Sequence, residues 1–405
     1  MRLTSPPAVY TVLWVTVVAL ADLQLTRQLL PMNPATLGLI AANVVSFWVI
    51  YLVMALAMRG KSDVVEARAA GLDFPCLRRF AGRLTRFWMA GSILEIIVAG
   101  GLPIQWLLAG DTSRDYRDFG VPSLHGLLTA VYLFILTARF LDYCFNRRGR
   151  DGWATLALLV WPLLQINRGA LIWSLLEMLG IFLLVRRVTP ARILQVGVAM
   201  LLGILLFGVV GDWRAGAGKE ALREITSERG RFLADDLPPG FLWVYLYVSS
   251  PVNNVVGGIE HLTPLYRPYY STASLLPTVV RERIYTDTAN RYALGLVNEA
   301  FNASTWYVNF LADFGVRGAI AIICVIQALM SYFYLQARRG RAWGVLAYGT
   351  LFQALALSIF TDTLTSLVTI AQLAIVIGYR QSLAAWVGAW SARRDALAAS
   401  PLPQE

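Results

Sequence analysis

The sequence predicts an all-α, polytopic membrane protein with about ten transmembrane helices and one large loop. Three observations predict this fold. Hydrophobic residues make up 57% of the 405 residues and charged residues only 15%, whereas a soluble domain is roughly one quarter charged. The apolar residues occur in blocks of about 20 residues, which is the length that a helix needs to cross a bilayer. The sequence lacks the short alternating segments of a transmembrane β-barrel, the other structure that can satisfy its backbone within lipid.

The predicted spans follow the apolar blocks, and the fifth is short enough to be tilted or partly interfacial. They cover residues 7–25, 36–58, 86–108, 122–144, 152–167, 169–186, 191–211, 314–336, 343–361 and 364–384. The chain therefore divides into four regions: seven spans within 1–211, a loop at 212–303, three spans within 304–390 and a tail at 391–405.

Basic residues in the short loops predict the orientation of the chain. One set of loops carries sixteen arginine and lysine residues, and the opposite set carries four. Basic residues accumulate in cytoplasmic loops, so we expect the first set and both termini to be cytoplasmic. The loop at 212–303 then lies on the outer side of the membrane.

This outer loop has a nearly neutral charge balance, with ten acidic and nine basic residues. Residues 218–232 place apolar and charged side chains at helical spacing, which predicts an amphipathic helix lying flat at the outer surface. Residues 241–259 are mostly apolar but contain Pro251 and Asn254, which predicts a re-entrant or interfacial helix. Polar, broken backbone at membrane depth requires protein or a water-filled cavity beside it, so Asn254 is a candidate site residue.

Several function classes lack their sequence motifs. The chain has no Walker A loop, no G-x-S-x-G elbow, no H-E-x-x-H pair and no D-x-D pair for a sugar-nucleotide metal. The three cysteines have no metal-ligand spacing, and two histidines alone cannot form a metal site. The net charge of +10 follows the topology and does not indicate nucleic-acid binding. We therefore expect no cofactor, no metal and no nucleic-acid partner.

Charged residues at the ends of the spans are the first candidates for a site. Ionisable groups near the bilayer are costly unless they face an anion, a partner or a water-filled cavity. Arg168 opens a helix at a tight outer turn, Arg214 follows the seventh span, and Asp313 lies in the first turns of the eighth. Each also has a structural interpretation, since the arginines can snorkel at helix ends and Asp313 can pair with Arg317.

Histidines and loop arginines form a second group of candidates. His261 in the outer loop could act as a general base, and His125 at the start of the fourth span is similar; solvated or structural roles are the alternatives. Arg223 and Arg281 are candidate anion ligands among the loop arginines. For each loop arginine taken singly, a salt-bridged surface role is the alternative.

Four segments carry a resemblance to a known family. They are DYRDFGVPSLHG at 115–126, NRG at 167–169, GDWR at 211–214 and NASTWYVNFLADFGVRG at 302–318. In the order and placement of these segments, and in its layout of spans with one large late loop, the chain resembles the bacterial oligosaccharide repeat-unit polymerases. These are the Wzy-type polymerases of O-antigen and capsule. They are similar in architecture to the O-antigen ligases, and their fold is similar to that of the GT-C glycosyltransferases.

The resemblance implies a polymerase at the periplasmic face of the bacterial inner membrane. Such enzymes move a growing glycan from undecaprenyl diphosphate to a sugar hydroxyl of a new lipid-linked repeat unit. The resemblance implies diphosphate binding by Arg168 and Arg214, and we add Arg223 and Arg281 to this group. Arginines suit that role because they stabilise the charge that develops on the leaving diphosphate.

The implied reaction also needs a base and contacts to the sugars. His261, Glu299 and Asp313 are the candidates for the general base, and the related ligases are associated with a loop histidine. Tyr245 and Tyr247 could stack on sugar rings, and packing in the aromatic belt is their alternative role.

Other functions remain open from the sequence. An O-antigen ligase shares the architecture and uses a lipid A core as its acceptor. A lipid-linked oligosaccharide flippase would need a polar central cavity, and a structural subunit of an export complex should tolerate Arg168→Ala. The expected partners are an undecaprenyl-diphosphate-linked oligosaccharide and membrane lipid, with a chain-length regulator protein as a further candidate.

Overall fold

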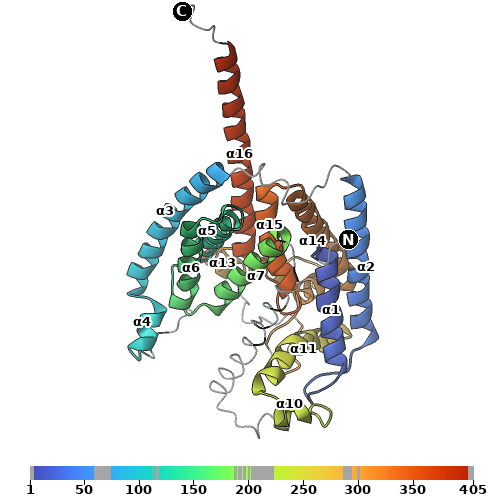
Figure 1. Ribbon diagram of the computed structural model, residues 1–405. Coiled ribbons are helices and arrows are strands. Elements are labelled where there is room, and N and C mark those ends of the chain that lie inside the picture. The colour runs from blue at the N-terminus through green and yellow to red at the C-terminus, as the bar shows by residue number, and fades with distance from the viewer. Residues whose placement is uncertain are drawn as a thin grey trace, which may run out of the picture.

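The described residues form α-helices joined by loops in a computed structural model (Figure 1). The structure describes residues 4–58, 74–111, 113–114, 118–186, 189, 194, 198, 201, 223–285, 294–298 and 302–399, without the side chains of 282 and 386–399. The helices are α1 (Pro6–Asp22), α2 (Pro34–Ala57), α3 (Phe74–Ala99), α4 (Pro103–Leu108), α5 (Leu124–Asn146), α6 (Gly149–Leu164), α7 (Arg168–Val185), α10 (Arg231–Asp235), α11 (Pro239–Ile259), α12 (Tyr270–Ala273), α13 (Thr278–Ile284), α14 (Tyr307–Arg338), α15 (Ala342–Leu357) and α16 (Leu367–Ala399).

Six described helical segments are long and apolar enough to cross a membrane. They are Pro34–Ala57, Phe74–Leu108, Leu124–Asn146, Arg168–Val185, Tyr307–Arg338 and Leu367–Ala385. The prediction of an all-helical, multi-pass membrane protein is therefore confirmed for the described part of the chain. Apart from 191–211, which lies almost wholly outside the described residues, every predicted span overlaps a helix, although 86–108 is divided between α3 and α4. The total of ten spans stays a prediction.

The bundle has two ends of different character. At the loop end, which is at the bottom of Figure 1, α3 and α6 finish and α5, α7, α14 and α16 begin. The opposite end, the arginine end, carries the chain reversal between α5 and α6 and the start of α3. These are the segments whose basic residues predict the cytoplasmic side.

Helix α15 is the buried centre of the bundle. Every residue from Ala342 to Leu355 is buried. One hydrophobic cluster joins α15 to α3, α5, α7 and α16, and a second joins it to α1, α2, α11 and α14, on either side of α15 in Figure 1.

Glycines allow α7 and α15 to approach closely. A Cβ at Gly180 would lie 2.7 Å from Cβ of Phe352, and a Cβ at Gly349 would lie 2.9 Å from Cγ1 of Ile181. Lipid tails are as apolar as leucine, so helices in a membrane associate through close van der Waals packing, which small residues permit.

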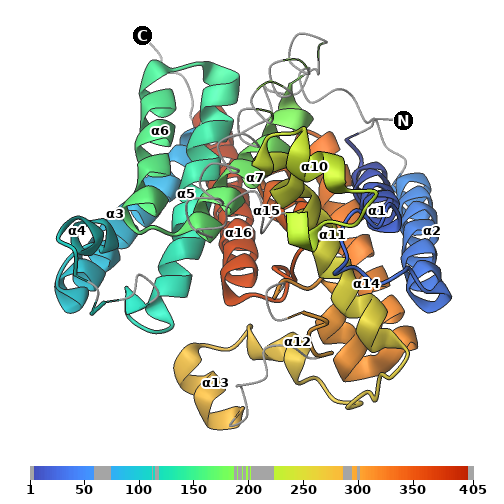
Figure 2. The same cartoon turned by 90° about the horizontal axis from the view of Figure 1, so that it is seen from below.

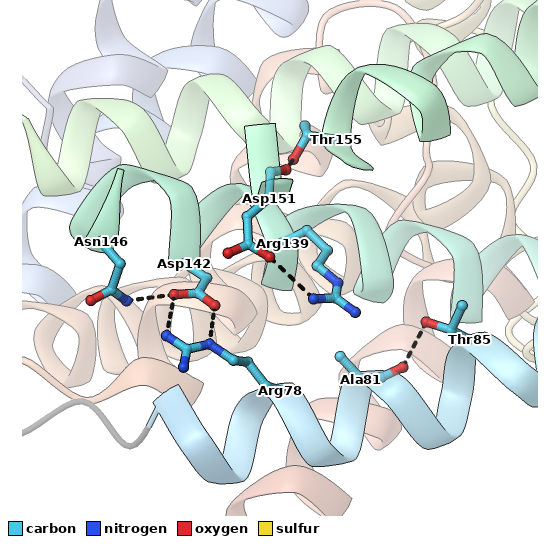
Figure 3. A network of polar contacts seen from close by, with 8 residues as sticks. All are labelled: Arg78, Ala81, Thr85, Arg139, Asp142, Asn146, Asp151 and Thr155. Carbon is cyan, nitrogen blue, oxygen red and sulfur yellow. Dashed lines mark hydrogen bonds and ion pairs between the residues drawn. The ribbon is translucent and has the colours of Figure 1, made fainter. Parts of the chain in front are cut away.

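Buried ion pairs join α3, α5 and α6 at the arginine end (Figure 3). Arg78 of α3 makes a two-pronged pair with Asp142 of α5, with 3.0 Å between Nη2 and Oδ1, and Arg139 of α5 lies 3.1 Å from Asp151 of α6. The two carboxylates are only 2% and 5% exposed. Removing one partner of such a pair leaves a buried charge uncompensated, at a cost of about 3–5 kcal/mol.

The helix predicted over 218–232 is not continuous in its described part. Residues 223–225 are helical, but Thr226 then forms an isolated β-bridge with Thr26, and Ser227 N–H donates to the Leu25 carbonyl at 3.0 Å. Gly230 lies so close to this segment that a Cβ there would be 1.9 Å from the Leu25 oxygen. Backbone pairing with residues 25–27, which follow α1, therefore replaces the helix, and local periodicity could not predict this contact. A new short helix, α10, begins at Arg231.

Helix α11 forms where the sequence predicts a re-entrant or interfacial helix, and its polar side chains hold neighbouring loops. Asn253 accepts the Leu30 N–H at 2.7 Å and donates to the Gln28 carbonyl at 2.9 Å. The Tyr245 hydroxyl accepts the Leu25 N–H at 3.0 Å. These bonds fix the segment between α1 and α2 against α11, at the loop end shown face-on in Figure 2.

We predict that Gly349→Ala lowers the thermal midpoint of the purified protein by several degrees. The added methyl group has to displace Ile181 or separate α15 from α7, and overpacking of this kind typically costs about 1–3 kcal/mol. Gly38→Ala is the matched control, because nothing lies within 4 Å of a Cβ there. Equal midpoints for the two variants would contradict close packing of α7 on α15.

Candidate functional site

A cavity of about 560 Å³ opens at the loop end. Three segments that are far apart in the sequence line it: residues 118–126 at the start of α5, residues 274–281 around the start of α13, and residues 366–368 at the start of α16. Its volume falls within the roughly 300–1,000 Å³ of small-molecule sites. We call it the loop-end cavity.

His125 and Glu95 form a hydrogen-bonded pair at the wall of this cavity. Glu95, on α3, is 1% exposed, and its Oε2 lies 3.2 Å from Nδ1 of His125. Its Oε1 accepts the Val121 N–H at 3.2 Å. His125 lines the cavity with 28% of its side chain exposed. A carboxylate that accepts the Nδ1 proton orients the imidazole and leaves Nε2 able to act as a base.

The backbone before α5 is shaped around this pair. Gly120 has φ 101°, and a Cβ there would lie 2.7 Å from Nδ1 of His125 and 2.8 Å from Oε1 of Glu95, so only glycine fits. Ser123 has φ 72°, which is uncommon for a residue with a side chain. Its buried Oγ has no hydrogen-bond partner among the described residues, although Ser123 lines the cavity. Strained backbone and unsatisfied polar groups cluster at functional sites.

Arg281 brings a cation to another wall of the cavity. It lies on α13, partly buried, in the segment that follows α12. This segment is joined to the start of α16, because Ser274 Oγ donates to the Thr365 carbonyl at 2.7 Å and the Leu367 N–H donates to the Ser274 carbonyl at 2.9 Å. The guanidinium therefore shares one cavity with the imidazole of His125.

Asp313 anchors the segment that carries Arg281. Its carboxylate, fully buried in α14, accepts the N–H groups of Tyr269, Tyr270 and Ser271 at 2.8–2.9 Å and the Ser271 hydroxyl at 2.6 Å. We call residues 264–285 the strap; it extends from α14 toward the segment before α5 (Figure 2). Four donors occupy the two oxygens of Asp313, so this geometry favours an anchoring role over the predicted role as general base.

Asp362 shapes the turn that leads into α16. It accepts the N–H groups of Leu364 at 3.1 Å and Thr365 at 3.2 Å, and the Thr365 hydroxyl also donates to it. Burial raises the pKa of the Asp362 carboxyl above its usual value, while these hydrogen bonds oppose the rise. The turn places Ser366 and Leu367 at the wall of the cavity.

Several predicted site residues lie away from this cavity. His261 is exposed just beyond the C-terminus of α11, and Arg168 is exposed as the first residue of α7. Arg223 forms an ion pair with Asp235 on the surface. Arg214 and Glu299 lie outside the described residues.

The three residues predicted to contact sugars already contact other parts of the protein. Tyr245 is buried and bonded to the segment after α1. Asn254 is 1% exposed; it donates to the Ala303 carbonyl at 2.9 Å and accepts the Val297 N–H at 3.0 Å. Tyr247 is 46% exposed and its ring stacks on Phe360, with 5.9 Å between the centroids.

Glu95 is the residue that the sequence interpretation missed. It is the only charged side chain in the apolar segment 87–108, and an ionisable residue in such a segment is by default a candidate for a site. That signal could have found it. Its pairing with His125, thirty positions later, requires the packing of α3 against α5.

Searches against protein-family models, curated proteins and solved structures find no match to this chain. Among the described residues, no three His, Cys, Asp or Glu side chains gather in a group that could hold a metal ion.

We predict that Asp313→Asn accelerates tryptic cleavage of the strap at Arg283, which is exposed. An amide offers one acceptor oxygen in place of two and points a donor at N–H groups, so the strap loses its anchor. Cleavage at the exposed Arg229 provides an internal control, because it lies outside the strap. Unchanged cleavage at Arg283 relative to Arg229 would show that Asp313 does not hold the strap.

Proposed function

We propose that the protein is a metal-independent glycosyltransferase that polymerises undecaprenyl-diphosphate-linked oligosaccharide repeat units. The loop-end cavity supports this most directly, because it brings together a carboxylate-held histidine and an arginine at one end of a multi-pass membrane protein. Transfer from a lipid diphosphate needs a base for the acceptor hydroxyl and a cation for the leaving group. The resemblance to Wzy-type polymerases supplies the substrate class.

In the proposed reaction, a sugar hydroxyl of the incoming lipid-linked unit attacks the anomeric carbon of the growing chain. The bond from that carbon to the diphosphate oxygen breaks, and undecaprenyl diphosphate leaves with the electron pair. His125 accepts the hydroxyl proton at Nε2, and Glu95 stabilises the resulting imidazolium. Arg281 stabilises the negative charge that grows on the diphosphate. Arg168 and Arg214 are proposed as further diphosphate ligands on the strength of the resemblance.

We place the loop end in the periplasm of a bacterial inner membrane and both termini in the cytoplasm. The excess of basic residues in the loops of the arginine end supports this orientation. A GT-C-like arrangement of about ten spans is part of the same proposal. The strap and the loop-end cavity would then face the compartment in which flipped, lipid-linked repeat units accumulate.

The packed interior favours an enzyme over a flippase. A flippase needs a polar passage through the bundle, whereas α15 is buried along nearly its whole length by apolar neighbours. An O-antigen ligase would use the same base and cation with a different acceptor. The surface polysaccharide of a deletion strain separates a polymerase from these two alternatives.

We predict that deletion of the gene collapses the polysaccharide ladder on a gel to a single-unit band, and that wild-type protein restores it. His125→Ala and Arg281→Ala should not restore it, because loss of a general base alone slows a reaction by roughly 10²–10⁴-fold. His261→Ala and Arg283→Ala are matched controls, since both residues are exposed and neither lines the cavity. Both controls should restore the ladder at equal expression.

Three outcomes would overturn parts of this proposal. An unchanged ladder after deletion excludes the polymerase. Complete loss of polysaccharide from the core indicates a ligase or a flippase. Restoration by His125→Ala but not by His261→Ala moves the base from the loop-end cavity to the outer loop.

A further inference from the structure

A second cavity, a groove of about 360 Å³, lies at the arginine end of the bundle. Its walls come from α5, α6 and α7, and most of them are apolar. The lining residues are Phe140, Tyr143, Gly149, Gly152, Trp153, Thr155, Leu156 and Met178. Glycine at 152 keeps the groove open, since even a Cβ there would lie 3.0 Å from the Tyr143 ring.

The outer wall of this groove has the character of a lipid-facing surface near the headgroups. Trp153 is 74% exposed, Leu156 is 55% exposed and Tyr143 is 41% exposed. Tryptophan and tyrosine gather where hydrocarbon meets headgroups, because one part of each ring system is apolar and another is polar. The composition of this wall is therefore typical of a surface at the level of the headgroups.

Three exposed arginines lie next to a lining residue of the groove, at the turn between α5 and α6. Arg147, Arg148 and Arg150 flank Gly149, which itself lines the groove. The neighbouring carboxylates are already engaged, since Asp142 is bonded to Arg78 and Asp151 to Arg139 (Figure 3). Arg148 lies within electrostatic range of Asp142, but none of the three forms an ion pair with a carboxylate that the structure describes.

We propose that this groove binds an anionic phospholipid, with an acyl chain along α5 and α6 and its phosphate against Arg147, Arg148 and Arg150. The charge of these arginines is complementary to an anionic headgroup, and the apolar walls are complementary to a chain. Arginine binds phosphate oxygens through paired N–H donors, and basic residues next to a membrane attract anionic lipids. The site is independent of the loop-end cavity and of the proposed polymerase activity.

The test uses full-length purified protein in detergent, with phosphatidylglycerol or phosphatidylcholine added. Phosphatidylglycerol should raise the thermal midpoint of the wild type, and phosphatidylcholine should raise it less. Replacing Arg147, Arg148 and Arg150 by glutamine should weaken phosphatidylglycerol binding by about tenfold or more. The matched control replaces Arg79, Arg83 and Arg86 by glutamine, which removes the same charge from exposed positions of α3. This control should retain the wild-type response.

Two further variants test the chain-binding part of the groove while keeping its arginines. Gly152→Leu fills the groove, and Trp153→Ala removes an exposed wall without disturbing the packed interior. Each variant should show a smaller rise in thermal midpoint when phosphatidylglycerol is added. Trp153→Ala should also keep the wild-type midpoint in the absence of lipid. The proposal would be overturned if the two lipids raised the thermal midpoint equally, or if the two arginine triplet variants lost the same affinity for phosphatidylglycerol. A wild-type response to phosphatidylglycerol in Trp153→Ala would also overturn it.

Discussion

The hydrogen bonds of the Asp313 carboxylate are the interaction on which the arrangement of the loop end depends. A carboxylate buried in a membrane helix is costly unless its acceptor sites are filled, and the strap fills them with four donors. The same bonds tie the strap to α14, and Ser274 then ties it to α16. These two attachments hold the segment that brings Arg281 to the cavity lined by His125, so one buried charge helps to determine which residues share that cavity.

The bundle uses its buried charges differently at its two ends. At the arginine end, Asp142 and Asp151 are matched by arginines, and the pairs hold helices together. At the loop end, Glu95 is matched by a histidine, whose ring can both donate and accept a proton. Carboxylates that are paired with arginine hold their helices in fixed positions. A carboxylate–imidazole pair can in addition exchange a proton with a bound molecule.

The sequence predicted the helices well because hydropathy and length are local properties. Segment 218–232 shows the limit: its helical periodicity is real, but pairing with residues 25–27 replaces the helix after Ile225. The candidate site was predicted only in part. Arg281 and the segment around His125 were singled out, while His261 ranked as a base because it lies in the outer loop. Asp313 was recognised as unusual, but its donors come from residues 269–271, some forty positions earlier, and no pattern in the sequence indicates that contact.

The burial of α15 from Ala342 to Leu355 affects how the bundle fits the thickness of a membrane. With 16 residues, a helix is about 24 Å long, shorter than the roughly 30 Å hydrocarbon core. Hydrophobic mismatch penalises a short helix only where it meets lipid, and α15 is surrounded by protein. It can therefore end inside the bilayer without deforming it. The turn after α15, which leads through Asp362 to the Ser366 and Leu367 wall of the loop-end cavity, therefore need not reach the level to which the longer, lipid-facing helices extend.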